Sequence, residues 1–179
     1  MNAEIPATYP LYLAGTWKQS SDTIEIHNPY NQELLAIVSR ATPGDLEQAI
    51  YTAATAFETT RSMPVHQRAS ILHTIATRLE ERAEEMARTI AQEAAKPLKQ
   101  ARAEVQRALF TFAYAAEEAR RIPGEVIHMD AASVGEGRQG IVQRFPIGPI
   151  AAITPFNFPL NLVAHKLAPA IAVGCPVVL

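Results

Sequence analysis

Residues Gly148–Leu179 read GPIAAITPFNFPLNLVAHKLAPAIAVGCPVVL, and this stretch decides the fold of the chain. It opens with a short apolar run, Ile150–Ile153, which is typical of a strand buried on both faces. Apolar residues at helical spacing follow over Leu160–Val173, and Val177–Leu179 begins a second apolar run. A strand, a loop, a helix and a second strand within this length predict a βαβ unit with a parallel sheet.

The loop of this unit, Thr154–Pro159, carries its most distinctive residues. Its two prolines end the strand, and Pro159 is placed to open the helix that Gly174 closes. Ligands of open α/β sheets lie at the carboxyl ends of strands, which is where this loop lies. The amide of Asn157, between two phenylalanines, suits a hydrogen-bond donor aimed at developing negative charge. Asn157 could equally do no more than turn the chain, and the residues alone leave both interpretations open.

Composition excludes several classes of protein. Of the 179 residues, 48% are hydrophobic and 19% charged, and the formal net charge is -2. There is thus no basic excess that would favour nucleic acid as a partner. No apolar stretch reaches the length of a membrane span, and the N-terminus lacks the pattern of a signal peptide. The single cysteine excludes an internal disulfide framework, so we expect a cytoplasmic protein.

The N-terminal part predicts a small antiparallel β meander. Leu11–Leu13 has the pattern of a short strand running into a turn, and Thr23–His27 alternates polar and apolar residues. Glu33–Val38 is a further strand after a turn. Residues 1–9 carry little pattern, and we expect a loose terminus there.

Three amphipathic helices are predicted next. The first begins at Thr42 or Pro43 and reaches Phe57, and the second is a longer helical region from Pro64 through Ile90. The third runs from Leu98 to Arg120. His66 and His73 share a face of the second, but two histidines without a third ligand do not predict a metal site. Without the strand-rich ends, these helices alone would indicate a helical bundle.

The segment between the helices and the C-terminal unit predicts a hairpin. Glu125–Met129 and Gly140–Phe145 pair across a polar loop in this prediction. Gly135–Gly140 spells G-x-G-x-x-G, the dinucleotide-binding pattern. That mechanism needs a strand before the first glycine and a helix after the last, whereas here a polar loop precedes and a β-rich run follows. We therefore do not predict a phosphate loop here.

Cys175 is the only cysteine, and its surroundings do not favour reactivity. It follows Gly174 and precedes Pro176 at the start of a buried strand, where a cysteine behaves as a small apolar residue. A reactive thiolate needs an adjacent base or positive charge, and these neighbours supply neither.

The motif Ile153–Pro159, followed by His165–Ala170 and then Gly174, resembles the NAD(P)-dependent aldehyde dehydrogenase superfamily, and most of all its lactaldehyde and glyceraldehyde-type branch. The order of the earlier elements agrees with that family over nearly the whole chain. Two small departures are Ala95, where the family usually has glycine, and Phe156, which is commonly tryptophan.

The resemblance implies an α/β fold made of the β meander, the three helices, an oligomerisation hairpin and the start of a Rossmann-like parallel sheet. It divides the chain into residues 1–124 and 148–179, both in the cofactor-binding domain, and a hairpin arm over 125–147 that joins subunits. In the family a Lys-Pro pair follows Leu179, then the rest of the cofactor domain and the catalytic domain. We therefore expect an N-terminal fragment that is inactive alone.

The activity implied is oxidation of an aldehyde to a carboxylic acid, with NAD or NADP as cofactor. A cysteine thiolate forms a thiohemiacetal and a glutamate assists hydrolysis, and neither residue lies within 1–179. Asn157 corresponds to the oxyanion donor, and Lys166 either belongs to a proton relay or extends to water. The positions that correspond to family sites for the cofactor are Ile153, Thr154, Pro155, Phe156 and Asn157. Those that line the substrate tunnel are Phe158, Asn161, Leu162 and His165.

The polar Asn161 and His165 hint at a small hydroxylated or phosphorylated aldehyde, and we expect a homo-oligomer that binds no metal, nucleic acid or membrane. Three alternatives remain open. The chain could be a non-catalytic fragment that binds nucleotide or only pairs with other chains. The complete enzyme could form an acyl-CoA instead of a free acid. A helical interaction module without cofactor is the third.

Overall fold

The C-terminal stretch forms the parallel pair of strands that its sequence predicts. A computed structural model of the protein describes residues 7–179. β8 (Ile150–Ala151) and β9 (Val177–Val178) pair in parallel, and α5 (Asn161–Val173) connects them. Gly174 ends α5 in the left-handed conformation, with φ of 85°. The predicted βαβ unit and its closing glycine are therefore confirmed. The prediction that Ile150–Ile153 is a strand buried on both faces is wrong, because β8 is only two residues long and Ala151 and Ile153 are exposed.

The N-terminal sheet has the order β1-β5-β4. β4 (Thr23–His27) and β5 (Leu34–Ser39) pair antiparallel, as predicted. β1 (Ala7–Tyr9) adds to the other edge of β5 in parallel, so the sheet is mixed. The expectation of a loose terminus over residues 1–9 is wrong for its last three residues, because backbone pairing with β5 orders them. Residues 1–6 lie outside the described residues.

A separate two-stranded sheet lies between β1 and β4 in the sequence. β2 (Leu11–Leu13) pairs antiparallel with β3 (Thr16–Lys18). The turn predicted after Leu13 is confined to Ala14 and Gly15, which both have positive φ, of 53° and 83°. The strand resumes directly after this tight turn.

α1 (Pro43–Thr60) begins where the sequence predicts, and Thr42 is its N-cap. The carboxylate of Asp45 accepts a hydrogen bond from the Thr42 backbone N–H at 2.9 Å, and the Thr42 hydroxyl accepts one from the Asp45 N–H. Lys18 Nζ lies 2.6 Å from the same carboxylate. Lys18 and then Thr42 lower the pKa of Asp45 from its ordinary value to about 2. This ion pair ties the β2–β3 hairpin to α1.

The second predicted helix is divided in the structure. α2 (Val65–Glu81) and α3 (Ala83–Ala94) are separated at Arg82, whose φ and ψ are -109° and 17°. The guanidinium of Arg82 binds Glu85 in the first turn of α3. The prediction of three helices before the hairpin is therefore wrong, because the apolar periodicity continues across a break that only the backbone shows. The two helices pack into different parts of the core.

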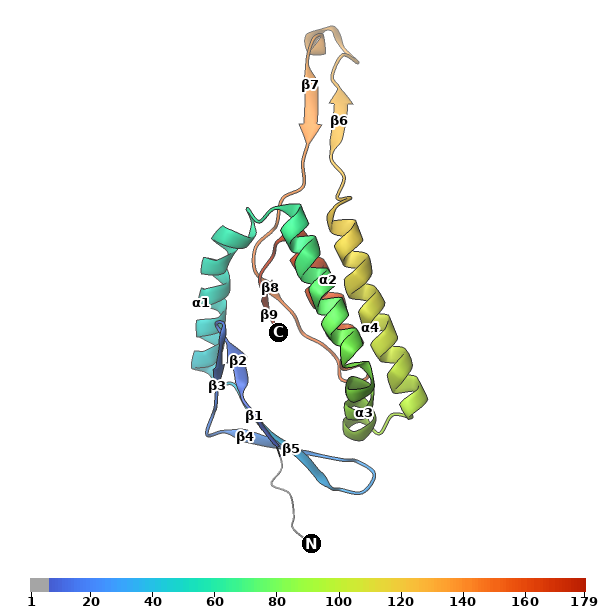
Figure 1. Cartoon of the computed structure of the whole chain (residues 1–179). Coiled ribbons are helices and arrows are strands. Elements are labelled where there is room, and N and C mark those ends of the chain that lie inside the picture. Colours follow the sequence, from blue (N-terminus) through green and yellow to red (C-terminus); the bar gives the residue numbers. More distant parts are fainter. Residues whose placement is uncertain (1–6) are drawn as a thin grey trace.

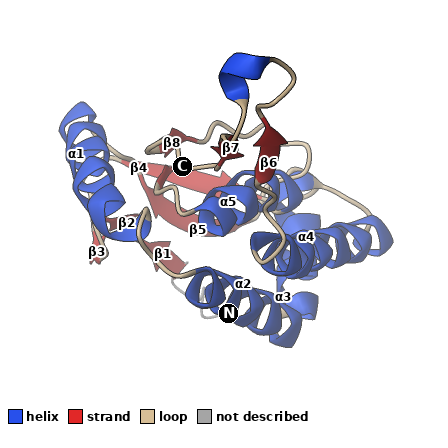
Figure 2. Cartoon of the chain, turned by 90° about the horizontal axis from the view of Figure 1, so that it is seen from above, coloured by secondary structure: helices blue, strands red, loops and turns tan. Residues whose placement is uncertain are grey.

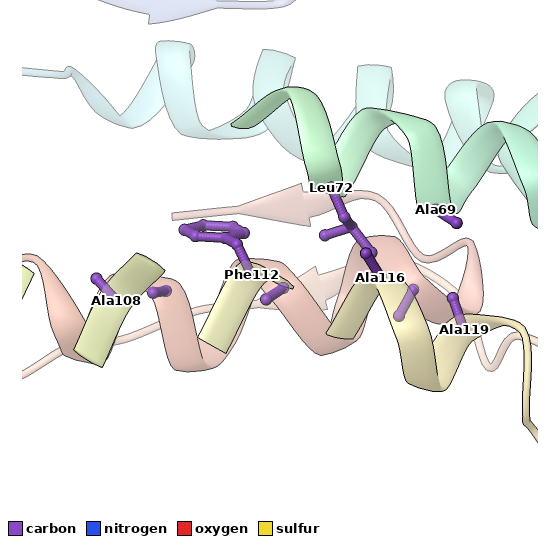
Figure 3. Packing of buried hydrophobic residues seen from close by; sticks show 9 residues of the cluster. Ala69, Leu72, Ala108, Phe112, Ala116 and Ala119 are labelled. Atoms are coloured by element: carbon purple, nitrogen blue, oxygen red, sulfur yellow. The ribbon is translucent and has the colours of Figure 1, made fainter. Parts of the chain in front are cut away.

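α4 (Leu98–Ala119) is the longest helix and runs beside α2 and α5. The main buried cluster lies between these three helices, as Figure 3 shows. Nearly all of its members are alanines, so the helix backbones can approach one another closely. The members are Ala69, Leu72, Ala108, Phe112, Ala116, Ala119, Ala164, Ala168 and Ala172.

The predicted hairpin is present and projects from the body (Figure 1). β6 (Glu125–His128) pairs antiparallel with β7 (Gln139–Val142). Its tip contains the short 3-10 turn Ser133–Gly135, and a Cβ added to Gly135 would lie 1.7 Å from the Met129 carbonyl oxygen. The first glycine of the G-x-G-x-x-G pattern thus allows a close backbone approach, and a strand follows the last glycine, as predicted.

α1 lies on one side of the β8–β9 pair and α2 to α4 lie on the other, which the two views agree on (Figure 2). The arrangement is the predicted mixed α/β fold. Among residues 7–179, no helix combines the length and apolar character needed to cross a membrane.

Two helix ends in the left-handed conformation give a paired prediction. Ala95 ends α3 with φ of 49°, where a Cβ costs about 1–2 kcal/mol. Ala95→Gly removes this cost but makes the unfolded chain more flexible, so the net stabilisation of the protein should be about 0.5–1 kcal/mol. Gly174→Ala should destabilise it by at least about 1 kcal/mol, since the new Cβ would also lie 2.7 Å from the Thr60 carbonyl oxygen. Urea unfolding midpoints of both variants measure this, and a lowered midpoint for Ala95→Gly would contradict it.

Candidate functional site

The loop between β8 and α5 is held at both ends by backbone hydrogen bonds. The Ala152 N–H donates to the Val178 carbonyl oxygen at 2.8 Å, which continues the pairing of β8 with β9. The Leu162 N–H donates to the Phe158 carbonyl oxygen at 3.0 Å, where α5 begins. With φ also fixed by prolines inside it, the loop keeps one shape at the carboxyl end of β8.

The five residues predicted to contact cofactor lie together on this loop and are largely exposed. Ile153 is 87% exposed and Phe156 is 91% exposed. Pro155 and Asn157 are also exposed, and Thr154 is half-buried. Large apolar side chains gathered on an exposed loop mark a surface that a ligand or further protein covers.

The backbone of Asn157 is held by a largely buried lysine that the sequence does not single out. Lys96 Nζ donates to the Asn157 carbonyl oxygen at 2.9 Å and lies 2.5 Å from the Glu104 carboxylate. It also lies 4.1 Å from the centre of the Phe158 ring, in cation–π contact. Lys96 was not predicted as a site residue, because the loop that it contacts lies 61 residues further along the chain.

Glu104 is the buried partner of this lysine and was not predicted. Its side chain is 0% exposed, on the inward face of α4. One carboxylate oxygen accepts hydrogen bonds from the N–H groups of Leu160 and Asn161, at 3.0 and 3.2 Å. These are the unpaired N–H groups at the positive end of α5, where a carboxylate is favourable.

A groove of about 750 Å³ lies between α4 and α5. Its walls are mainly apolar, and Phe110 and Tyr114 stack in it with ring centres 5.7 Å apart. Among its polar lining residues are Arg107, Asn161 and His165. Apolar walls with a few polar groups are typical of small-molecule sites. The α4 residues were missed, although their three- and four-residue spacing along one helix face could have revealed them.

Of the predicted substrate residues, two line the groove and two do not. Asn161 and His165 are in its wall, whereas Phe158 and Leu162 are not among its described lining residues. Asn161 is only 8% exposed, and its side-chain oxygen has no hydrogen-bond partner among residues 7–179. A buried oxygen without a partner is costly, so this group is available to a ligand. Lys166 lies on the exposed side of α5.

Cys175 is buried, with 4% of its surface exposed, and its backbone N–H bonds the Ala170 carbonyl oxygen at 2.8 Å. This is the surrounding predicted for a packing residue. In the described part of the chain, no three His, Cys, Asp or Glu side chains are grouped to hold a metal ion.

The geometry is that of a preformed loop beside a groove, and the comparisons with known proteins agree with the resemblance. A sequence model described as the aldehyde dehydrogenase family matches residues 17–179. The chain belongs to this family.

Similar proteins are much longer than this chain. The 3-sulfolactaldehyde dehydrogenase of Priestia megaterium is 41% identical over 96% of the chain and 35% of its own length. Aldehyde dehydrogenase 21 of Physcomitrella patens, solved with the reaction product succinate, is 43% identical with a TM-score of 0.93, over 97% of this chain and 36% of that one. The NADP-dependent glyceraldehyde-3-phosphate dehydrogenase of Bacillus halodurans, solved with NADP, is 33% identical with a TM-score of 0.90, over 97% and 37%. The chain therefore spans about a third of these relatives.

The burial of Cys175 gives a direct prediction. Iodoacetamide should leave this thiol unmodified in the native protein and alkylate it fully after unfolding in urea, because a thiol enclosed by packing is not accessible to the reagent. Mass-spectrometric mapping of the peptide that contains Cys175 measures both states. Rapid alkylation without denaturant would contradict the packing role.

Proposed function

We propose that this chain is the N-terminal part of an NAD(P)-dependent aldehyde dehydrogenase and that Asn157 is its side-chain oxyanion donor. The observation that carries the proposal is an exposed amide on a loop of fixed shape, at the carboxyl end of β8. An amide fixed before reaction stabilises the charge that develops on an aldehyde oxygen under attack. The complete enzyme would oxidise an aldehyde to a carboxylic acid, with its nucleophilic cysteine and assisting glutamate outside residues 1–179.

Ile153, Thr154, Pro155 and Phe156, together with Asn157, are proposed to contact the nicotinamide end of the cofactor. The exposed aliphatic and aromatic side chains suit contact with the flat nicotinamide ring. The Asn157 amide beside them suits this role too, because the nicotinamide ring must lie close to the carbon that reacts. When bound, NAD or NADP would supply the acceptor for the hydride that the aldehyde carbon loses.

The groove between α4 and α5 is proposed as part of the substrate site. Asn161 and His165 offer polar contacts there, Arg107 adds a positive charge, and Phe158 and Leu162 are proposed to complete the wall nearer the loop. The lining also contains Glu118, whose carboxylate pairs with Arg121 at 3.1 Å, so we propose that Arg107 binds a small aldehyde with an anionic group. The three relatives described above are associated with anionic compounds of the same kind. The name of the first contains a sulfonate, the second was solved with the carboxylate succinate, and the name of the third contains a phosphate.

Lys166 is proposed as either a proton-relay residue or a lysine that extends to water; its exposure favours the second role. Residues 1–124 and 148–179 are proposed as parts of the cofactor-binding domain, and 125–147 as an arm between subunits of a cytoplasmic homo-oligomer. Continuation of the reading frame past the Leu179 codon into a Lys-Pro pair and a downstream cysteine would support the proposal, and a stop codon there would contradict it.

The role of Asn157 predicts a selective kinetic defect. Asn157→Ala in the complete enzyme should lower kcat about 10²- to 10³-fold, because one oxyanion donor is removed, while the dissociation constant of the cofactor stays within threefold. Steady-state kinetics and cofactor titration measure both. The matched control is Asn31→Ala, an exposed asparagine in the β4–β5 turn, which should leave kcat unchanged. Near-normal turnover of Asn157→Ala would refute the assignment.

The arm predicts that oligomerisation depends on exposed apolar side chains. Val126 and Ile141 are cross-strand partners that are 61% and 70% exposed, so a pair of opposite charges there should not unfold the hairpin. The double variant Val126→Lys/Ile141→Glu should shift the complete protein to a smaller oligomer or a monomer in sedimentation velocity, because the docking surface becomes charged. The control Tyr30→Lys changes an exposed aromatic residue in the β4–β5 turn, outside the arm. An unchanged sedimentation coefficient for the arm variant would exclude the arm from the interface.

A further inference from the structure

A single buried carboxylate joins three elements that meet behind the Asn157 loop. Glu104 of α4 bonds Lys96 through one oxygen and the first N–H groups of α5 through the other. The carboxylate is fully buried among apolar residues of α4, where an ionised group persists only if it is paired and hydrogen-bonded. Its hydrogen-bond partners among residues 7–179 lie in the α3–α4 connection, at the end of the loop and at the start of α5.

Lys96 extends this network directly to the backbone of Asn157. Its side chain is 12% exposed, and Nζ divides its hydrogen bonds between Glu104 and the Asn157 carbonyl oxygen. The residues around it are stiff: Ala95 is in the left-handed conformation and Pro97 restricts the backbone of the residue before it. Lys96 therefore has little freedom to leave its position.

We propose that Lys96 and Glu104 are positioning residues, which hold the Asn157 loop and the first turn of α5 in one fixed arrangement so that the Asn157 amide is placed for catalysis. The inference rests on the proposed function of Asn157. The side chain of Asn157 lies on the exposed face of the loop, so its position is set through its backbone. A shift of about 1 Å in a catalytic group can lower the rate about 10²-fold. In this proposal the pair acts through the loop and not directly on the substrate or the cofactor.

The first variant is Lys96→Met, which removes the bond to the Asn157 carbonyl and keeps a side chain of similar length. The second is Lys96→Met/Glu104→Gln, which also removes the unpaired buried charge. The glutamine oxygen can still accept from the N–H groups of Leu160 and Asn161, so α5 stays anchored and the double variant folds even if the single variant does not.

The matched control is Arg102→Met. Arg102 on α4 pairs with Glu84 on α3 through two bonds of 2.8 Å and thus also joins the α3 and α4 segments. It has no contact with the loop, and both side chains are about half exposed. Its loss should leave kcat within twofold of the parent.

Kinetics of the complete enzyme test whether the pair acts through Asn157. Lys96→Met, and the double variant with Glu104→Gln, should lower kcat at least about tenfold, with KM and the cofactor dissociation constant within threefold. In an Asn157→Ala background, the same substitutions should lower kcat by no more than about twofold, because the donor that they position is absent. An equal loss in both backgrounds, or no loss in the parent, would overturn the inference.

Hydrogen exchange separates this inference from the proposed function. In the double variant, the peptide covering residues 154–162 should exchange faster than in the parent, while peptides from α2 remain unchanged. If Asn157→Ala retains full turnover, the oxyanion assignment fails, and positioning for catalysis fails with it. In that case, faster exchange in the double variant would still show that Lys96 holds the loop. Unchanged exchange would show that Lys96 does not hold the loop either.

Discussion

The ion pair and hydrogen bonds of the buried Glu104 carboxylate are the interactions on which the loop between β8 and α5 depends. An ionised group inside an apolar core is tolerated here because it meets both a lysine and the positive end of a helix. Its partners come from three places in the chain: the α3–α4 connection, the end of the loop, and the start of α5. The arrangement of these segments is therefore coupled, and none of them can move without leaving a buried charge or N–H group unpaired.

α4 links this network to the rest of the molecule. One face of the helix packs Ala108 and Phe112 against α2 and α5, and another presents Arg107 and Phe110 to the groove. The alanines of the core bring the helices close, so the groove and the loop have fixed walls. A helix that looks like simple scaffolding in the sequence thus determines the positions of both the loop and the groove.

Local patterns in the sequence predicted most elements of the fold. Proline and glycine marked the ends of α5, and alternation marked β4 and the hairpin, since these signals act between near neighbours. The division at Arg82 and the parallel pairing of β1 escaped prediction, because a continuous apolar stripe conceals the first and a distant strand creates the second.

The site was predictable only in part, for the same reason. The loop that carries Asn157 can be recognised in the sequence by its prolines and aromatic residues. Lys96 and Glu104 do not, because their partners lie 61 and 56 residues away and only the packed structure brings them together. The place of Arg107 in the groove likewise could not be predicted, because the groove exists only when α5 packs beside α4.

The most direct test of the account is a crystal structure of the complete enzyme with a substrate-derived adduct on its nucleophilic cysteine. We expect the side-chain nitrogen of Asn157 to lie about 2.7–3.1 Å from the adduct oxygen, with Lys96 still bonded to the backbone of Asn157. An adduct oxygen bound by other donors, with the Asn157 amide turned away from it, would contradict the central claim.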